Sequence, residues 1–347
     1  MRNRLEANSI SRKAVSMSGA SQKFLTGPQA HSITKQLHKA RQVFFSIPGY
    51  FQELSRLRHP TELYSWIYFK FPNLFPLRRT PTYVTVEPTN KCNLGCTHCW
   101  HASMARPAGY MDVETFEKIV KEASLFRPAL FKIGGAGEPA IHPHFRELMQ
   151  SLASHRLRVF VYTNGSLLRL FSPKEILGWG IDTIVVSVDG LDARTYEKIK
   201  IGSRYEDLKK LVIDFHRYRN SFKHTHPVVE IRHIMMPTES AAQILKFRNY
   251  WLTMADTVRF NAFEPASGFF ELDDPSPPRC RQIRRELCVQ WDGRVPVCGG
   301  YREYAGSVRD YSLSELWRHP RIEFLRHCNL SRDFAQVPLC RRCCHCR

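Results

Sequence analysis

Short apolar runs and longer amphipathic segments follow one another along residues 82–263. The apolar runs have the length of β-strands, and the segments between them carry apolar residues at helical spacing. The run "IVVSV" inside 182–190 is continuously apolar, as a strand covered on both faces of a parallel sheet requires. Six strands that alternate with helices predict an α/β fold with a parallel sheet and right-handed crossovers. The predicted strands are 83–88, 130–135, 158–165, 182–190, 228–236 and 257–263, and the predicted helices are 112–126, 144–155, 173–178, 192–219 and 240–254.

The alternation ends near residue 270, which predicts a separate C-terminal part. Residues 273–278, "DDPSPP", are expected to form a linker. Residues 286–298 predict a β-hairpin with Asp292-Gly293 as its turn. Residues 312–328 predict a helix that is interrupted at Pro320.

The N-terminal segment has a different composition. Residues 1–80 carry 13 Lys and Arg against three acidic residues, so they hold much of the net charge of +19. Residues 31–70 predict two amphipathic helices in which aromatic residues stand beside Lys and Arg. Two interpretations stay open: helices that pack on the main domain, or an arm that contacts an anionic membrane or an anionic substrate. The predicted domains are 1–80, 81–265 and 266–347.

The chain shows no targeting signal for secretion. No apolar signal-peptide core follows the basic start, and there is no run of about 18 apolar residues that would span a membrane. We therefore expect a cytoplasmic protein, with peripheral membrane contact as the alternative. The eleven cysteines are then more typical of metal or redox sites than of disulfides.

Three cysteines, Cys92, Cys96 and Cys99, lie within eight positions, and no further cysteine follows until Cys280. A structural zinc ion needs four protein ligands, whereas three ligands leave one iron of a [4Fe–4S] cluster open. The cysteine loop follows the first strand, at the edge of the sheet where α/β folds bind ligands. This placement predicts a reactive iron–sulfur cluster.

The stretch "EPTNKCNLGCTHC" resembles the signature of radical S-adenosylmethionine (SAM) enzymes, and the resemblance extends in order over residues 82–263. "GGAGEP" is similar to the element that meets the methionine amino group, and "YTNG" and "VSVDG" match the next strand ends. Taken alone, the glycines would indicate only a tight turn, and Asp189 only an Asp-Gly turn. The resemblance implies cofactor contacts by His98, Gly135, Gly137, Glu138, Asn164, Ser187 and Asp189.

This resemblance implies a partial (β/α)6 TIM-like barrel and a specific chemistry. The open iron would bind SAM, and one electron, from a donor such as flavodoxin or ferredoxin, would cleave it. The resulting 5′-deoxyadenosyl radical would remove a hydrogen atom from the substrate. The catalytic acid or base stays unassigned. Arg232 and His233, neighbours on one strand, are expected to point to opposite faces.

A second group of cysteines stands near the C-terminus. Cys280 and Cys298 flank the predicted hairpin, and Cys340 and Cys343 form a CxxC pair. The spacing resembles the auxiliary-cluster domains called SPASM and its shorter form, twitch, which implies one auxiliary [4Fe–4S] cluster. A zinc ribbon is the alternative. Cys346 forms another CxxC pair with Cys343, so the ligand register stays open. Cys288 is expected to be a buried, inert thiol, and Cys328 and Cys344 have no assigned role.

Three functions are considered. The first is a radical SAM oxidoreductase that dehydrogenates a hydroxylated sugar- or cyclitol-like substrate. The second is a radical SAM maturase that modifies a ribosomally made peptide or a protein side chain. The third is a zinc-dependent nucleic-acid-binding protein, suggested by the charge and the C-terminal cysteines. The basic excess lies mostly in residues 1–80 and forms no clear platform for base stacking, which makes nucleic acid the weakest of the three partners.

Overall fold

The computed structural model describes Ile67 and residues 76–126, 130–155, 157–263, 280–299 and 303–343. The predicted helices of residues 31–70 and the linker at 273–278 lie outside this range, as do Cys344 and Cys346.

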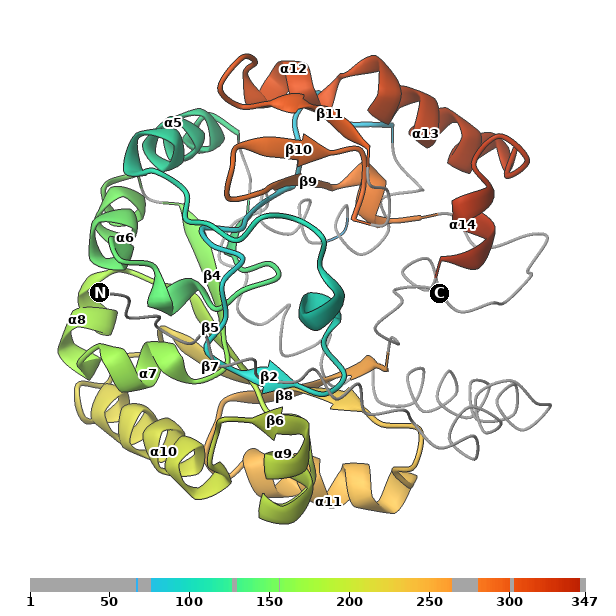
Figure 1. Cartoon of the computed structure of the whole chain (residues 1–347). Coiled ribbons are helices and arrows are strands. Elements are labelled where there is room, and N and C mark those ends of the chain that lie inside the picture. Colours follow the sequence, from blue (N-terminus) through green and yellow to red (C-terminus); the bar gives the residue numbers. More distant parts are fainter. Residues whose placement is uncertain are drawn as a thin grey trace, which may run out of the picture. The chain divides into compact units, whose positions relative to one another are not determined.

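A parallel sheet forms the centre of the described structure (Figure 1). All neighbouring strands pair in parallel, in the order β8-β7-β5-β4-β3-β1-β9. The six predicted strands are confirmed, and β9 joins them as a seventh. The predicted α/β fold class is therefore confirmed. The strands are β1 (Tyr83–Val86), β3 (Leu130–Ile133), β4 (Arg158–Thr163), β5 (Thr183–Ser187), β7 (Val228–Met235), β8 (Thr257–Ala262) and β9 (Glu286–Val289).

Helices form an arc around one face of this sheet (Figure 1). Their apolar sides pack on the strands; Phe116 of α5, for example, meets Phe131 of β3 with ring centroids 6.0 Å apart. Asp112 caps α5 as predicted, because its side chain accepts the Thr115 N–H. The helices are α5 (Val113–Ser124), α6 (Phe145–Ser154), α7 (Ser166–Leu170), α8 (Pro173–Gly178), α9 (Ala193–Ile199), α10 (Tyr205–Ser221) and α11 (Ala241–Trp251).

Several short elements were not predicted, among them helix α7 and strand β6 (Lys200–Ile201). Helix α7 starts directly after Gly165, whose φ of +107° is accessible mainly to glycine. Strand β6 separates α9 from α10 and pairs with β2 (Gly95–Cys96), which belongs to the cysteine loop. A two-residue strand leaves almost no periodic signal in the sequence, so this pairing becomes visible only in three dimensions.

The C-terminal part corrects one detail of the predicted hairpin. The turn at Asp292-Gly293 is present, with Gly293 at φ +83°. However, β10 (Arg294–Pro296) pairs with β11 (Tyr304–Ser307), while β9 extends the central sheet beside β1. This arrangement covers the edge of β1, whose backbone groups would otherwise be unpaired. Pro320 starts a new helix, so the predicted interruption is confirmed. The remaining elements are η4 (Gln282–Arg284), α12 (Leu313–Trp317), α13 (Pro320–Ser331) and α14 (Pro338–Arg342).

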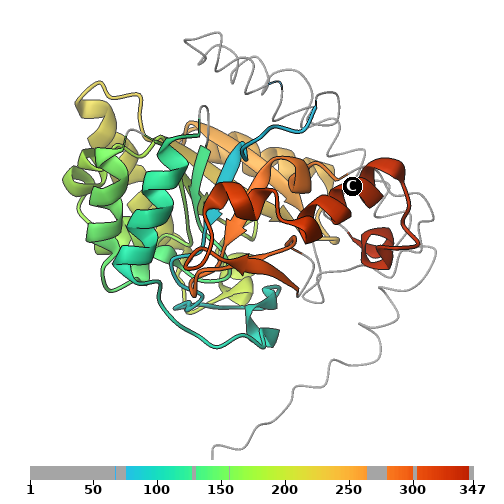
Figure 2. The same cartoon turned by 90° about the horizontal axis from the view of Figure 1, so that it is seen from above.

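Polar contacts fasten this C-terminal part to α5. The Lys118 ammonium donates to the Val308 carbonyl at 2.5 Å, and Glu122 accepts the Leu313 N–H at 2.6 Å. Figure 2 shows the C-terminal elements, in red and orange, beside the light-blue strand β1. The boundaries of the predicted domains stay a prediction. Within the described ranges no helix is long and apolar enough to cross a membrane.

Candidate functional site

The three-cysteine loop is pinned at the carboxyl edge of the sheet. It follows β1, and its β2 strand pairs with β6, while the Thr97 N–H donates to the Ile199 carbonyl at 2.9 Å. Cys92, Cys96 and Cys99 are free, partly buried thiols. The structure therefore brings together the three cysteines that the sequence predicted as cluster ligands.

The thiols lie close enough to influence one another. Burial raises the pKa of Cys96 to about 11, and the charges of Cys99 and Cys92 add to the effect while Lys200 opposes it. Burial likewise raises the pKa of Cys92. Thiols of this kind are protonated until they bind a metal, so cluster assembly would release protons.

Three thiols on one loop can serve as ligands of an iron–sulfur cluster. A cubane cluster binds each cysteine through a different iron, so its ligands stand farther apart than those of one zinc ion. Three neighbouring thiols on one loop fit such a cluster.

The glycines of "GGAG" pack against the cysteine loop. A Cβ at Gly135 would lie 2.6 Å from Glu87 Cγ, and one at Gly137 would lie 2.3 Å from the Lys91 carbonyl oxygen. From the sequence, these glycines were expected to let a ligand approach the backbone closely. The structure adds a different reason: any side chain there would push the cysteine loop away from the end of β3.

Glu87, a residue that the sequence reading did not select, ties this region together. Its carboxylate accepts two hydrogen bonds from Arg106, at 2.8 and 3.0 Å, and one from the Ala136 N–H at 2.8 Å. The ion pair is largely buried. The sequence offered one sign that Glu87 is part of the site: it follows β1 directly and stands just before the cysteines.

Glu138 and Asn164 meet beside the first cysteine. The Glu138 carboxylate is 2% exposed and accepts hydrogen bonds from Thr163 Oγ1 at 2.9 Å and from the Asn164 N–H at 2.6 Å. Burial raises the pKa of Glu138 to about 7, although these hydrogen bonds oppose the shift. The Asn164 amide nitrogen lies 3.9 Å from Cys92 Sγ. An acid whose charge changes near neutral pH thus stands next to the cluster loop.

A buried cation, Lys200, joins Ser187 and Asp189. Its ammonium lies 2.8 Å from Ser187 Oγ and 2.8 Å from Asp189 Oδ2. Burial disfavours the ionised form of Asp189, but the charge of Lys200 and then that of His98 hold the Asp189 pKa below its ordinary value. Lys200 was missed by sequence reasoning, because it reaches Ser187 only after α9 turns the chain back at β6.

His98 faces the same acid. Its Nε2 lies 3.6 Å from Asp189 Oδ2, and burial lowers the pKa of the ring. Its Nδ1 is buried and has no hydrogen-bond partner among the described residues. The cofactor roles expected for His98, Gly135, Gly137, Glu138, Asn164, Ser187 and Asp189 stay predictions.

The sheet face turned away from the helices carries charged side chains. The cationic groups of Lys132 and Arg232 lie 4.6 and 5.4 Å from the centroid of the Tyr162 ring. Arg232 also pairs with Glu230. His233 points the other way, as predicted, and is wholly buried between the Val188 carbonyl at 2.9 Å and Glu239 at 2.8 Å.

The second cysteine group gathers from distant parts of the chain. Burial raises the pKa of Cys340 to about 12, and the thiols of Cys298, Cys280 and Cys343 raise it further. The four cysteines that the sequence predicted as ligands are therefore neighbours in space. Cys328 of α13 also contributes to the shift, which the sequence reading did not anticipate.

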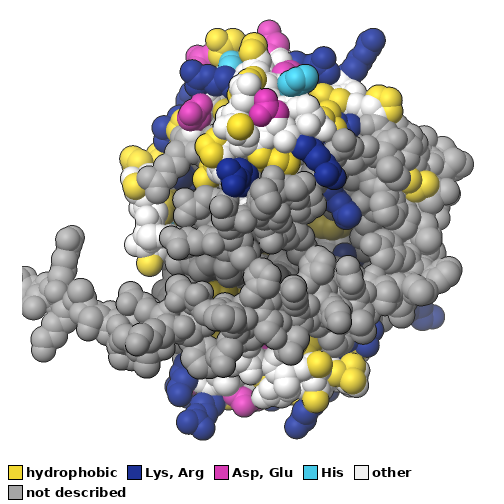
Figure 3. Space-filling model, turned by 90° about the vertical axis from the view of Figure 1, so that its right-hand side faces the viewer, with side chains coloured by type: hydrophobic (Ala, Val, Ile, Leu, Met, Phe, Trp, Pro, Cys, Tyr) yellow, Lys and Arg dark blue, Asp and Glu magenta, His cyan; other side chains and the backbone are white. Residues whose placement is uncertain are grey.

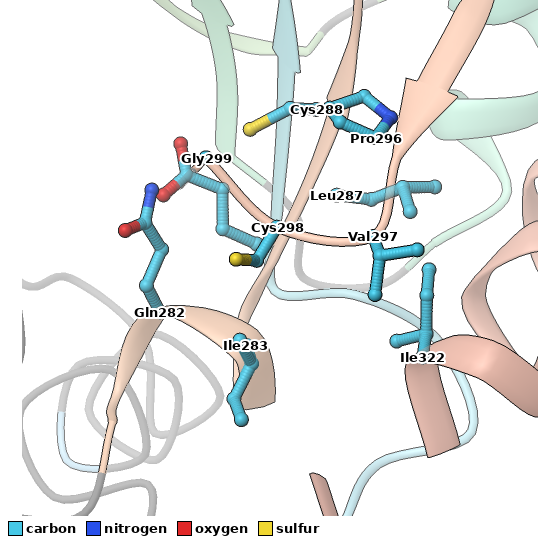
Figure 4. A pocket seen from close by; sticks show the side chains of 10 residues that line it. Gln282, Ile283, Leu287, Cys288, Pro296, Val297, Cys298, Gly299 and Ile322 are labelled. Carbon is cyan, nitrogen blue, oxygen red and sulfur yellow. The ribbon is translucent and has the colours of Figure 1, made fainter. Parts of the chain in front are cut away.

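Cys288 lies between this group and the charged face. Burial raises its pKa well above the ordinary value, and the nearby Glu286 carboxylate adds to the shift. Figure 4 shows the sulfurs of Cys288 and Cys298 on the same side of a small pocket, whereas Leu287 and Val297 point away from them. Cys288 is partly and not fully buried, and its expected role as an inert thiol stays a prediction.

A buried amide borders the second group. The Cys280 N–H donates to Asn329 Oδ1 at 2.8 Å, while Asn329 Nδ2 is buried without a hydrogen-bond partner among the described residues. The two N–H groups of Asn329 Nδ2 could donate hydrogen bonds to sulfur atoms of a bound cluster. These residues therefore fit an iron–sulfur cluster.

Known proteins match both parts of the site. Residues 86–250 match the radical SAM superfamily, and residues 280–344 match the SPASM iron–sulfur cluster-binding domain. The tungsten-containing aldehyde ferredoxin oxidoreductase cofactor-modifying protein of Pyrococcus furiosus is 26% identical over 70% of this chain and 83% of its own length. The antilisterial bacteriocin subtilosin biosynthesis protein AlbA of Bacillus subtilis is 27% identical over 74% of this chain and 65% of its own length.

A solved structure shares the fold. Streptococcus suis SuiB bound to precursor peptide SuiA superimposes with a TM-score of 0.59 at 14% sequence identity, over 78% of this chain and 72% of that one. At this level of identity the similarity concerns the fold. It agrees with an α/β barrel-like core followed by a small C-terminal domain.

Proposed function

Because the chain belongs to the radical SAM superfamily and carries an iron–sulfur cluster-binding domain of the SPASM type, we propose that it modifies a peptide by radical chemistry. The chain is an enzyme, and its cofactors are SAM and [4Fe–4S] clusters. The substrate class is the new element of this proposal.

The observation that carries the peptide assignment is the similarity to AlbA, which extends over about three quarters of this chain. AlbA is named for the biosynthesis of a bacteriocin, and SuiB, which shares the fold, was solved with a precursor peptide. These relatives favour the peptide maturase over the dehydrogenation of a sugar or cyclitol, which had been the first expectation from the sequence.

We assign the first cluster to Cys92, Cys96 and Cys99. When bound, the cluster and SAM supply a 5′-deoxyadenosyl radical that removes a hydrogen atom from the substrate. Glu138 in its ionised form would accept a hydrogen bond from the amino group of SAM. Ser187 and Lys200 offer a hydroxyl group and an ammonium group to a carboxylate, which needs both hydrogen bonding and charge compensation when it leaves water.

The charged sheet face is the proposed substrate side. The side chains of Lys132 and Arg232 are 28% and 20% exposed, although both belong to strands that have a neighbour on each side. Partly exposed cations beside an aromatic ring can hold the polar backbone or a carboxylate of a peptide. Cys280, Cys298, Cys340 and Cys343 would hold the auxiliary cluster near this face, where it can accept an electron from the substrate.

The electron donor and the contact with an anionic surface, both expected from the sequence, are proposals as well. A flavodoxin or ferredoxin is the proposed electron donor. Contact with an anionic membrane or substrate through residues 31–80 is proposed from the sequence alone.

Nucleic-acid binding would be supported by a concentrated basic surface. On the described part of the face in Figure 3, Lys and Arg are spread out instead of gathered in one patch.

The test compares two substrate panels with the anaerobically reconstituted full-length enzyme, SAM and a reductant. One panel contains synthetic peptides encoded by small reading frames beside the gene, and the other contains sugars and aminocyclitols. We expect a peptide to stimulate 5′-deoxyadenosine formation and to change mass in proportion. Stimulation by a polyol together with silence of all peptides would overturn the peptide assignment in favour of the dehydrogenase.

A further inference from the structure

Helix α13 places one polar side chain against the auxiliary cysteines. Asn329 is 0% exposed, and its Oδ1 accepts the backbone N–H of Cys280 at 2.8 Å. The neighbouring residue on the helix, Cys328, is close enough to Cys340 to influence its pKa. Asn329 therefore contacts the second cysteine group through the backbone of Cys280.

The orientation of the amide follows from its chemistry. A backbone N–H can only donate, so its partner must be the oxygen of Asn329, and the amino group of the same planar amide points elsewhere. That amino group is buried and has no hydrogen-bond partner among the described residues. Buried amide donors in folded proteins are almost always satisfied, so an acceptor is expected beside Nδ2.

The acceptors expected beside Asn329 Nδ2 are sulfur atoms. Asn329 Oδ1 holds the backbone of Cys280, so Nδ2 of the same amide lies close to this cysteine. The thiols of Cys280, Cys298 and Cys343 are in turn near enough to Cys340 to raise its pKa. When thiols bind iron they become thiolates, and the cluster adds sulfides, so negatively charged sulfur atoms would fill this space. An amide N–H next to such sulfur atoms would find an acceptor.

We propose that Asn329 donates a hydrogen bond to a sulfur of the auxiliary cluster and thereby raises its reduction potential. This inference rests on the proposed auxiliary cluster. A hydrogen bond to sulfur is stronger in the reduced state, because reduction adds negative charge to the cluster. A higher potential makes the cluster a better acceptor for the electron that a substrate radical releases. Asn329 is thus a positioning and tuning residue that does not itself touch the substrate.

Two substitutions separate the donor from the acceptor of this side chain. Asn329→Asp keeps an oxygen for the Cys280 N–H and loses the amino group. Asn329→Leu loses both and adds no charge. The only change that the two variants share is the loss of the Nδ2 donors. Ser331→Ala is the matched control, since Ser331 is an exposed residue of the same helix whose hydroxyl donates to the His327 carbonyl.

The measurement is an anaerobic redox titration followed by electron paramagnetic resonance (EPR), with iron and zinc content determined for each sample. It uses the full-length chain carrying Cys92, Cys96 and Cys99→Ala, so that the auxiliary cluster gives the only signal. We expect both Asn329 variants to be about tenfold harder to reduce, a fall of about 59 mV for one electron, while Ser331→Ala keeps the wild-type potential.

Two results would overturn the inference, and they differ from each other. If Asn329→Asp has the wild-type potential and only Asn329→Leu changes, the side chain merely holds the Cys280 backbone. If the site contains zinc and gives no signal, the auxiliary cluster itself is absent and the tuning role falls with it. The iron and zinc content tells these two failures apart.

Discussion

The two cysteine groups of this protein are built in opposite ways. Cys92, Cys96 and Cys99 come from one loop of eight residues that a two-residue strand pairing holds in place. Cys280, Cys298, Cys340 and Cys343 come from segments that meet only through the packing of the C-terminal part. The first group can form as soon as its loop is ordered, whereas metal binding at the second contributes to the folding of a whole region.

Their surroundings differ as well. Glu138, His98, Asp189 and Lys200 place acidic and basic groups around the first cysteines. At the second group, the backbone N–H of Cys280 donates to the neutral amide of Asn329. Opposite charges suit the binding of SAM, which carries an ammonium and a carboxylate group. A neutral amide suits a cluster that only exchanges electrons. This difference agrees with the proposed division between a site for SAM binding and cleavage and a site for electron transfer.

The largest expected effect comes from removing the first group. In the protein with Cys92, Cys96 and Cys99 all changed to Ala, 5′-deoxyadenosine formation should fall to background, because no cluster can then bind SAM. Iron content should drop from about eight to about four per chain. Iron analysis and chromatography of the SAM products check both numbers. Reductive cleavage that survives in this variant would show that the loop does not hold the cluster.

Removing half of the second group should give a more selective loss. Cys340→Ala with Cys343→Ala should also remove about four irons, yet slow cleavage of SAM should continue in the absence of substrate. Product formation should fall to background, because the auxiliary cluster can no longer accept the electron. Normal turnover by this double variant would contradict the electron-acceptor role.

A smaller change can damage the first group without touching a ligand. Gly137→Ala places a Cβ 2.3 Å from the Lys91 carbonyl oxygen, so the cysteine loop must shift, at a cost of about 1–3 kcal/mol. We expect incomplete loading of the first cluster, about tenfold slower SAM cleavage and an intact second cluster. Gly178→Ala is the control, because no atom lies within 4 Å of the added Cβ. Equal behaviour of the two variants would remove the packing role of Gly137.

The mildest effect concerns pH. With a pKa of about 7, the Glu138 carboxyl is neutral below this value and ionised above it. Only the ionised form attracts the ammonium of SAM, so SAM affinity should rise as the pH increases from 6 to 8. Glu138→Gln should bind SAM about tenfold more weakly at pH 8 and lose this part of the pH dependence. Equilibrium binding at several pH values tests the prediction, and identical profiles for both proteins would exclude Glu138 as the ammonium partner.

The sequence revealed the first group more fully than the second. Six strands, the Asp112 cap and the cysteine loop depend on neighbours along the chain, and the structure agrees with all of them. The pairing of β9 with β1 joins residues about two hundred positions apart, and no local pattern encodes it. Lys200 and Cys328 were missed for the same reason. Their partners become neighbours only after α9 and α13 have packed.

The resemblance to radical SAM enzymes implied cofactor roles for residues whose local sequence indicated only turns. Spacing alone left a glycine turn and an Asp-Gly turn as adequate explanations of "GGAG" and "VSVDG". The structure now gives Gly135 and Gly137 a packing reason and gives Asp189 a buried cation as its partner. These roles do not compete with cofactor binding, since the same contacts fix the geometry of the loop that would hold the cluster.

The central claim is that only the first cluster has an open iron for SAM. It is tested most directly by EPR of the reduced proteins before and after addition of SAM. The Cys340→Ala, Cys343→Ala variant retains the first cluster, and its signal should change when SAM is added. The Cys92, Cys96, Cys99→Ala variant retains the second, and its signal should stay the same because four thiolates leave no iron open. A SAM-dependent change in the second variant, or none in the first, would contradict the division of roles between the two cysteine groups.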